Sequence, residues 1–283
     1  KEVDGRTEIP ILFDTYGSVF VVFRVAKADV PAESASVNGE VVLSADNPVA
    51  APTYSVFAKP GKLSLAMADG TKVEESFKAR PNVGLDTNWT VTFPKESDIE
   101  KPMLFKTLTP WNEHADERIR YFSGTAIYER DFNCEPDGHE IWFELGLVEV
   151  ISELYINGKK AETLWKPPYK ANITDLVRRG KNRVEVHVAN LWPNRMIGDE
   201  RFPLDFEARG RGLVWPLPQW LIDDKPRPEP RRKSFATCSY YTKDDPLLPS
   251  GLIGPVRIRY TPKMSDPRLQ QVSEFIARHA VEE

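Results

Sequence analysis

Alternation between apolar and polar residues is the main pattern along this chain. The segment 182–190 places Val184, Val186 and Val188 on one face, which is the period of two of a half-buried strand. Residues 254–260 alternate in the same way. Helical spacing is almost absent until the last twenty residues. The pattern therefore predicts an all-β protein built from antiparallel strands.

The clearest supersecondary unit lies in the middle of the chain. Residues 152–156 alternate and then break at Asn157-Gly158, a pair that adopts the positive φ angles of a tight hairpin turn. A second short strand ends at Trp165, and two prolines within residues 166–169 force an extended path out of the sheet. Residues 172–177 predict one helical turn with a polar cap, after which the next strand begins.

A length of 283 residues is enough for about two domains, each able to bury a core. Residues 1–82 predict a small antiparallel β-sandwich, and residues 83–263 predict a second, larger one. A (β/α)₈ barrel is excluded because it needs about 250 residues of alternating strands and helices. Residues 264–283 predict a C-terminal helix that docks on the sandwich or on a partner. Its apolar stripe consists of Leu269, Val272, Phe275, Ile276 and Ala280.

Charge and composition exclude several classes of function. The formal net charge is −4, and most cations are interspersed with acids, so nothing indicates nucleic-acid binding. The basic cluster 227–233 is interrupted by prolines and predicts a solvated loop. No apolar run reaches the ~18 residues of a membrane span. Cys134 and Cys238 leave two alternatives open, a disulfide or two buried free thiols.

Several motifs carry a resemblance to known families. The run LYINGKKAETLWKPPYKANITDLVRRGKNRVEVHVAN resembles the jelly-roll sugar-binding domain of family 2 glycoside hydrolases. Four ordered segments, RIRYFSGTAIYERDF, LWKPPYKANITD, NLWPNRMIGDE and LLPSGLIGPVRIR, together resemble the C-terminal part of glycoside hydrolase family 106, the α-L-rhamnosidases. The resemblance covers residues 88–262, and YGSVFVVFR fits the preceding segment.

This resemblance implies both a fold and a biological setting. It implies a galactose-binding-like jelly roll for residues 83–263 and a larger, rhamnosidase-like parent hydrolase. The implied partners are a rhamnose-containing plant or microbial polysaccharide and a missing catalytic barrel domain. It further implies export, hence a periplasmic or extracellular location.

No residue of this chain is assigned a catalytic role. In the family that the chain resembles, the catalytic carboxylates and the bound calcium belong to the barrel, and the strand pattern of this chain offers no barrel to hold them. The four histidines have no metal-ligand spacing, neither cysteine has a CxxC partner, and no GxSxG elbow is present. We therefore expect no cofactor, with a structural calcium as an open alternative.

A candidate sugar-facing site follows the strand at 182–190. Aromatic rings stack on the apolar faces of sugars, and amides, carboxylates and Arg satisfy hydroxyls. Residues 190–200 hold this mixture, and further rings can join them. The alternative is that this segment docks the domain onto the missing barrel, with Trp192 buried and Arg195 paired to Asp199 or Glu200. Docking is the favoured alternative, because loops that combine a ring with Arg are good interface anchors. The candidates are Asn190, Trp192, Asn194, Arg195, Asp199, Glu200, Trp165, Tyr169 and Trp111.

The sequence thus predicts a non-catalytic, carbohydrate-associated β-sandwich portion of a rhamnosidase-like glycoside hydrolase. Such a portion would support or extend the active cleft. Two alternatives stay open, a free-standing carbohydrate-binding module and a hydrolase in its own right.

Overall fold

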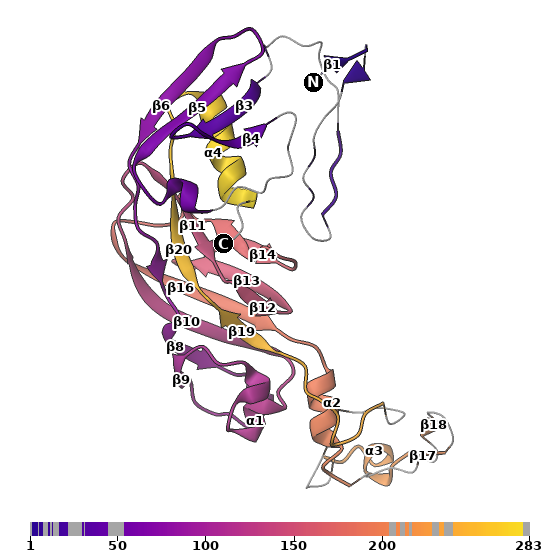
Figure 1. Cartoon of the computed structure of the whole chain (residues 1–283). Helices are drawn as coiled ribbons and strands as arrows, with labels where there is room; N and C mark the ends of the chain where they lie inside the picture. The colour runs from indigo at the N-terminus through magenta and orange to yellow at the C-terminus, as the bar shows by residue number, and fades with distance from the viewer. Residues whose placement is uncertain are drawn as a thin grey trace.

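The protein is dominated by antiparallel sheets, as expected from its alternating pattern (Figure 1). A four-stranded sheet and the C-terminal helix lie at one end of the elongated molecule, and helix α2 (Pro193–Asp199) lies at the other. The all-β prediction and the C-terminal helix are both confirmed. The computed structural model describes residues 2–4, 6–7, 11, 13, 17–21, 30, 32–44, 54–203, 208–209, 213–214, 217–227, 232–234 and 240–279.

The larger body is a sandwich of two antiparallel sheets. The six-stranded sheet has the order β14-β13-β16-β10-β8-β9, and the sheet that faces it has the order β15-β11-β20-β7. The six strands are β8 (Thr87–Thr92), β9 (Met103–Thr107), β10 (Thr125–Cys134), β13 (Ile151–Ile156), β14 (Lys159–Leu164) and β16 (Gly180–Ala189). The four strands are β7 (Val83–Gly84), β11 (His139–Glu144), β15 (Lys170–Asn172) and β20 (Arg257–Pro262). A short pair, β12 (Leu147–Glu149) with β19 (Gly251–Gly254), borders them.

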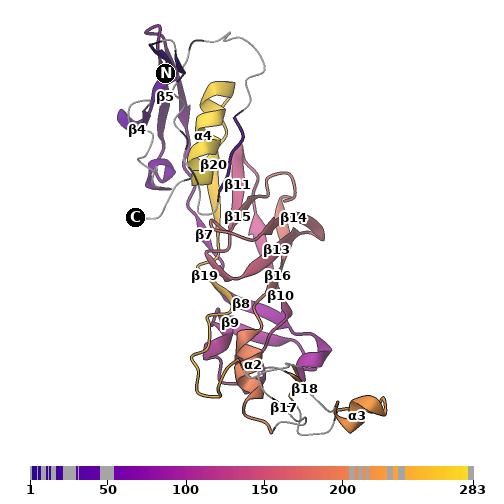
Figure 2. The same cartoon turned by 90° about the vertical axis from the view of Figure 1, so that its right-hand side faces the viewer.

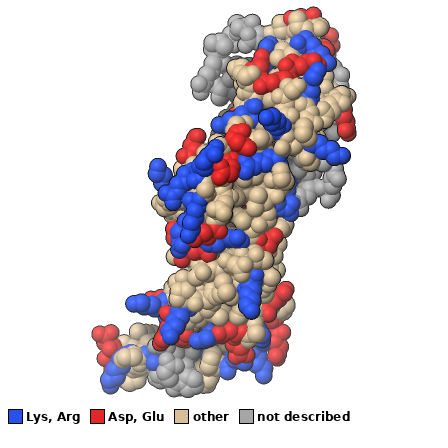
Figure 3. Space-filling model, turned by 90° about the vertical axis from the view of Figure 1, so that its left-hand side faces the viewer, with Lys and Arg blue, Asp and Glu red and all other residues tan. Residues whose placement is uncertain are grey.

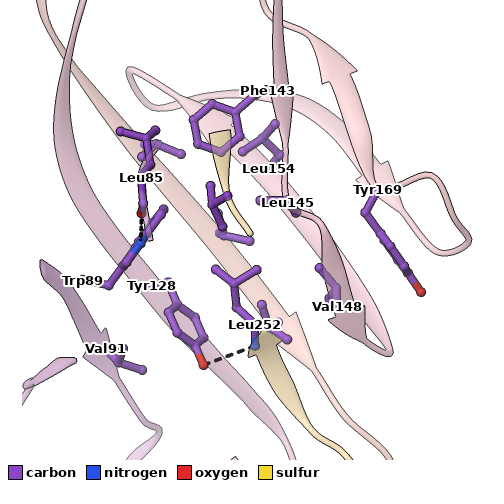
Figure 4. Packing of buried hydrophobic residues seen from close by; sticks show 14 of the residues in the cluster. Leu85, Trp89, Val91, Tyr128, Phe143, Leu145, Val148, Leu154, Tyr169 and Leu252 are labelled. Atoms are coloured by element: carbon purple, nitrogen blue, oxygen red, sulfur yellow. Dashed lines mark hydrogen bonds between the residues drawn. The ribbon is translucent and has the colours of Figure 1, made fainter. Parts of the chain in front are cut away.

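The core between these sheets is made by the strand positions that alternation predicted. Val184, Val186 and Val188 on β16 are fully buried. Tyr128 on β10 lies opposite Val186 in the register and is equally buried. Side chains from both sheets meet between them, as Figure 4 shows for Phe143 and its neighbours. The hydrophobic effect over this shared interior holds the sheets together.

The Asn157-Gly158 hairpin has the predicted geometry. Both residues have positive φ, 52° and 76°, and they join β13 to β14 with Ile156 opposite Lys159. Asn157 tolerates this region because its side chain forms local hydrogen bonds. Here its Nδ2 donates to Leu176 O and to Asn182 Oδ1, so the turn is also tied to the segment before β16 and to the start of β16 itself.

The N-terminal sheet has the order β4-β3-β5-β6. We expected a small sandwich over residues 1–82. In the described residues, the second layer over this sheet is the helix α4 (Pro267–His279), which packs on β5 and β6 (Figures 1 and 2). The helix therefore docks on its own chain. The strands are β3 (Ala32–Val37), β4 (Glu40–Ser44), β5 (Gly61–Met67) and β6 (Lys72–Phe77).

The long passage 191–234, in which alternation predicts no strand, begins with the helix α2. Pro193 stands in the first turn of α2, where a proline loses no hydrogen bond. The remaining elements are short, and Trp215 lies outside the described residues. They are β1 (Glu2–Val3), β2 (Arg6–Thr7), η1 (Tyr54–Phe57), η2 (Lys95–Ser97), η3 (Trp111–Glu113), α1 (Glu117–Arg120), β17 (Ala208–Arg209), β18 (Leu213–Val214) and α3 (Gln219–Ile222).

Charges on the surface are mixed in sign. Figure 3 shows Lys and Arg beside Asp and Glu over one whole face of the molecule. In the part of the chain that the structure describes, no helix has the length and apolarity needed to cross a membrane. Cys134 is a buried free thiol, and Cys238 lies outside the described residues.

Candidate functional site

Two predicted amides fix the position of helix α2 at the end of the six-stranded sheet. Asn190 follows β16 directly; its Oδ1 accepts from Gly124 N at 3.0 Å, and its Nδ2 donates to Phe122 O at 2.9 Å. Asn194 is 2% exposed and exchanges two bonds of 2.8 Å with the backbone of Leu248. Both side-chain amides are thus occupied by hydrogen bonds to the backbone of the same chain. They also line a small pocket of about 130 Å³, and Ser250 lies on its wall.

The next pair along α2 is a buried ion pair. Arg195 Nη2 lies 2.9 Å from Asp199 Oδ1, one turn later on the helix, at ion-pair distance but without hydrogen-bond alignment. The other oxygen of Asp199 accepts from Ser234 N at 2.6 Å and from Ser234 Oγ at 2.5 Å. The structure therefore pairs Arg195 with Asp199, one of the two partners considered from sequence.

Glu200 anchors a different arginine. Its two oxygens accept from Arg232 Nη1 and Nη2 at 2.8 and 3.0 Å, a bidentate pair. Arg232 also donates to Phe202 O and is only 8% exposed. Our interpretation of residues 227–233 as a solvated loop is therefore wrong for Arg232. The sequence around Arg232 does not show that the carboxylate of Glu200, at the end of α2, pairs with it in the folded protein.

Two pockets of about 390 Å³ each meet beside α2 and form a single groove. They share Ser97, Asp98, Arg118, Arg195 and Lys233. Helix α2, the loop around η2 and helix α1 supply the walls, all at the lower end of the molecule in Figure 1.

The predicted aromatic side chains have three different environments: exposed in the groove, exposed outside it, and buried. Trp192 is 59% exposed and lines the groove, so the burial expected for docking is not present within this chain. Trp165 is 58% exposed but follows β14, outside the groove lining. Trp111 is fully buried, with its Nε1 donating to Tyr128 OH at 2.5 Å. Tyr169 is also buried and donates to Val150 O at 3.0 Å. Only Trp192 and Arg195 among the candidates line the groove.

Sequence reasoning missed the groove's remaining cations. Arg118 lies on α1 and is held by Asp116, whose Oδ2 accepts from Nη2 at 2.6 Å. The Arg118 guanidinium keeps the pKa of Asp116 below its usual range. Lys233 donates to Glu96 O and to the carboxylate of Asp98. A basic residue next to an acid is too common in this chain to serve as a signal.

A carboxyl group with a raised pKa, of the kind that acid–base chemistry needs, lies outside the groove. Burial, with the nearby charge of Glu274, raises the pKa of Glu140. Glu140 lies where α4 meets β11, and its Oε1 accepts from Gln270 Nε2 at 2.9 Å. It lines neither groove pocket. The groove itself offers fixed cations, an exposed indole and polar edges, which suit binding.

Across the described residues, no group of three or more His, Cys, Asp or Glu side chains is placed to hold an ion.

Comparisons with known proteins point to glycoside hydrolases. No family model matches the chain. A protein of Formosa agariphila, provisionally named a β-glucuronidase, is 35% identical over 258 residues, which are 89% of this chain and 22% of that relative. The solved rhamnosidase from Novosphingobium sp. PP1Y is 28% identical with a TM-score of 0.51, covering 70% of this chain and 18% of the enzyme. The β-D-glucuronidase of Dictyoglomus thermophilum is 22% identical with a TM-score of 0.44, over 65% of this chain and 28% of that one.

The chain thus spans about a fifth of the length of its curated relative and of the solved rhamnosidase. The first two likenesses fit a glycoside hydrolase-like β-sandwich region, without singling out family 106. The third has a TM-score too low to carry an argument.

Proposed function

We propose that this chain is a non-catalytic β-sandwich portion of a larger, rhamnosidase-like glycoside hydrolase of family 106, where it supports or extends the active cleft. The observation that carries the proposal is the match of 89% of this chain to 22% of a much longer relative named for glycoside hydrolysis. The rhamnosidase likeness and the ordered motifs support the family. Because such enzymes act on polysaccharides, the proposal includes a periplasmic or extracellular location.

The groove's carboxylates support a binding role over a catalytic one. Glycoside hydrolysis needs a carboxylic acid of raised pKa facing a base or nucleophile. Asp98 is bonded to Lys233, and Glu117 lies 2.7 Å from Arg201 Nη1. Both carboxylates are thus already paired with a cation of the same chain, and neither faces a second carboxylate in a described pair.

An apolar strip supplies the surface for docking. We define it as Ile151, Trp165, Leu191 and Leu248, whose exposed fractions are 43%, 58%, 54% and 43%. Leu191 and Leu248 line the small pocket at Asn194, and Ile151 and Trp165 flank the Ser152–Leu164 pair of the β13–β14 register. Exposed apolar patches mark interaction sites, and we assign this one to the catalytic domain of the same hydrolase.

The experiment compares turnover by this chain and by the longer protein. We expect no hydrolysis of aryl α-L-rhamnoside or aryl β-D-glucuronide by residues 1–283 alone. In the longer protein, Leu191→Asp should lower activity and the melting temperature of the catalytic domain. Leu104→Asp is the matched control, because Leu104 is 60% exposed on β9 and lies outside the strip. Sustained turnover by residues 1–283, at the ~1–10³ s⁻¹ typical of enzymes, would refute the proposal.

A free-standing carbohydrate-binding module is the second candidate, favoured by the exposure of Trp192 on the groove. Isothermal titration with rhamnose-containing oligosaccharides separates the two. Binding by residues 1–283 that is lost in Trp192→Ala and kept in Trp165→Ala would favour the module. The two tryptophans are equally exposed, so the pair controls for loss of surface area.

A further inference from the structure

Three cations converge where the two groove pockets meet. Arg118 comes from α1, Arg195 from α2, and Lys233 from the segment that follows Arg232. These are the positively charged residues that line both pockets. Any ligand that spans the groove therefore passes them.

Each of the two arginines at this junction is held by an aspartate that lies outside the groove lining. Asp116 binds Nε and Nη2 of Arg118 at 3.0 and 2.6 Å, and Asp199 lies 2.9 Å from Nη2 of Arg195. Neither aspartate lines a pocket. A guanidinium has five N–H donors, and for Arg195 the described residues show Asp199 as its partner. The Nε of Arg195 is buried, and Arg118 Nη1 donates to Asp98 O at 3.0 Å, so the terminal Nη groups of Arg195 remain for a ligand, on a side chain whose orientation is already set.

The groove lining holds more cations than carboxylates, although Asp116, Asp199 and Glu200 pair three of those cations from outside the lining. Its carboxylates are Glu96, Asp98 and Glu117, and Asp98 is bonded to Lys233. Arginine and lysine side chains only donate hydrogen bonds, so they are satisfied best by an anionic acceptor. A neutral sugar could also accept from these groups through its hydroxyl oxygens, but only an anion would add charge complementarity to the hydrogen bonds. The lining cations are Lys95, Arg118, Arg195, Arg201, Arg227, Arg232 and Lys233.

One exposed ring stands on the wall of the same groove. Trp192 lines the pocket that also contains Arg118, Arg195 and Lys233. An indole face is suited to the apolar face of a pyranose ring. The pocket volume of about 390 Å³ lies within the range of about 300–1,000 Å³ for small-molecule sites.

We infer that this groove is a subsite for an acidic sugar residue. Trp192 stacks on the ring, and Arg118, Arg195 and Lys233 bind its carboxylate or sulfate ester. The inference rests on the proposed carbohydrate role and adds the chemical class of the ligand.

The test uses three ligands that share one sugar skeleton: methyl β-D-glucuronide, D-glucose 6-sulfate and methyl β-D-glucoside. Binding to residues 1–283 is followed by NMR shifts of the tryptophan indole N–H groups at low salt and at 0.15 M salt. We expect at least one acidic ligand to bind tenfold or more tightly than the glucoside, and more weakly at the higher salt. Comparison of the two acidic ligands distinguishes a uronate from a sulfate ester.

Arg118→Gln should remove the preference for the acidic ligand. Arg118 is 53% exposed, so this variant should fold, whereas a change at the buried Arg195 would strand Asp199. Arg183→Gln is the matched control: Arg183 is 55% exposed and pairs with Glu129 on β10, outside the groove lining. Trp192→Ala should weaken binding of acidic and neutral ligands together.

Equal binding of glucuronide, sulfate and glucoside would overturn the inference, as would selectivity that survives Arg118→Gln. Absence of binding by all three would also overturn it. None of these results affects the proposed function, whose test depends on turnover and on Leu191 at the docking strip.

Discussion

The two hydrophobic cores of this molecule are assembled in different ways. The core of the larger sandwich buries thirty described residues, all from within 85–260, between two sheets. The N-terminal core buries eleven, and three of these, Met264, Leu269 and Ile276, come from the other end of the chain. The smaller core is therefore complete only with the last helix packed on it. Both cores join segments far apart in sequence, as in the pairing of β20 with β7 and β11, but the smaller one also needs a helix from the opposite end of the chain.

Hydrogen bonds reinforce the packing of α4, and of the residues just before it, against both regions. Ser265 N donates to both oxygens of Glu75 on β6, at 2.9 and 2.8 Å. Lys170 Nζ, from β15 in the larger sandwich, donates to Ala277 O at 2.8 Å. The helix thus joins the N-terminal sheet to the larger sandwich, and a defect in α4 should loosen that sheet first.

The largest expected effect is from Leu269→Asp. It removes a fully buried side chain and places a carboxylate in the smaller core, at a cost above about 4 kcal/mol. Hydrogen exchange should rise across β3, β5 and β6 while β10 and β16 keep their protection. Gln271→Asp, at an exposed position of the same helix, is the control and should leave both regions protected. Loss of protection in β10 together with β5 would show that the two cores unfold as one.

Two tryptophans test the difference between core and groove residues in the part of the chain after residue 85. Trp111→Ala should lower the unfolding free energy by about 3–5 kcal/mol, because it empties a fully buried site and removes the donor to Tyr128 OH. Trp192→Ala should change it by less than about 0.5 kcal/mol, because Trp192 is largely exposed. Urea denaturation followed by circular dichroism measures both. Similar losses in the two variants would contradict the division into core and groove residues.

The smallest effect is a pH dependence of opposite sign in the two regions. The raised pKa of Glu140 means that the folded state holds this proton more tightly than the unfolded chain. Its contribution to stability therefore falls as pH rises from the ordinary pKa of Glu through the raised value. Glu140→Gln should accordingly gain stability relative to the parent between pH 4 and pH 7.

Glu74 on β6 is the opposite case and the control. Bonds from Lys72 and Lys62 lower its pKa to about 2. Its contribution is present above the ordinary pKa of Glu and is lost as pH falls toward 2. Glu74→Gln should be less stable than the parent at pH 7, with the difference shrinking in acid. Denaturant midpoints across this range measure both variants, and parallel pH trends would contradict the assignment.

Much of the fold was predictable from local pattern, and little of the site was. The strand around Val186 and the Asn157-Gly158 hairpin follow from alternation and turn propensity, which involve residues close in sequence. Helix α2 was missed because it is short and has a glycine and a proline among its seven residues. Arg118 and Lys233 were missed because only folding brings α1 and residue 233 to the side of α2.

The sequence by itself determined that the chain is all-β, that a hairpin turns at Asn157-Gly158, and that aromatic and arginine side chains follow β16. Only the tertiary structure decided their environments. Pro110-Trp111-Asn112 and Trp192-Pro193-Asn194 have the same composition in a different order, yet one tryptophan is fully buried and the other lines a groove. Strand alternation and turn geometry are set by a few neighbouring residues, whereas burial and charge pairing depend on which distant elements pack against a side chain.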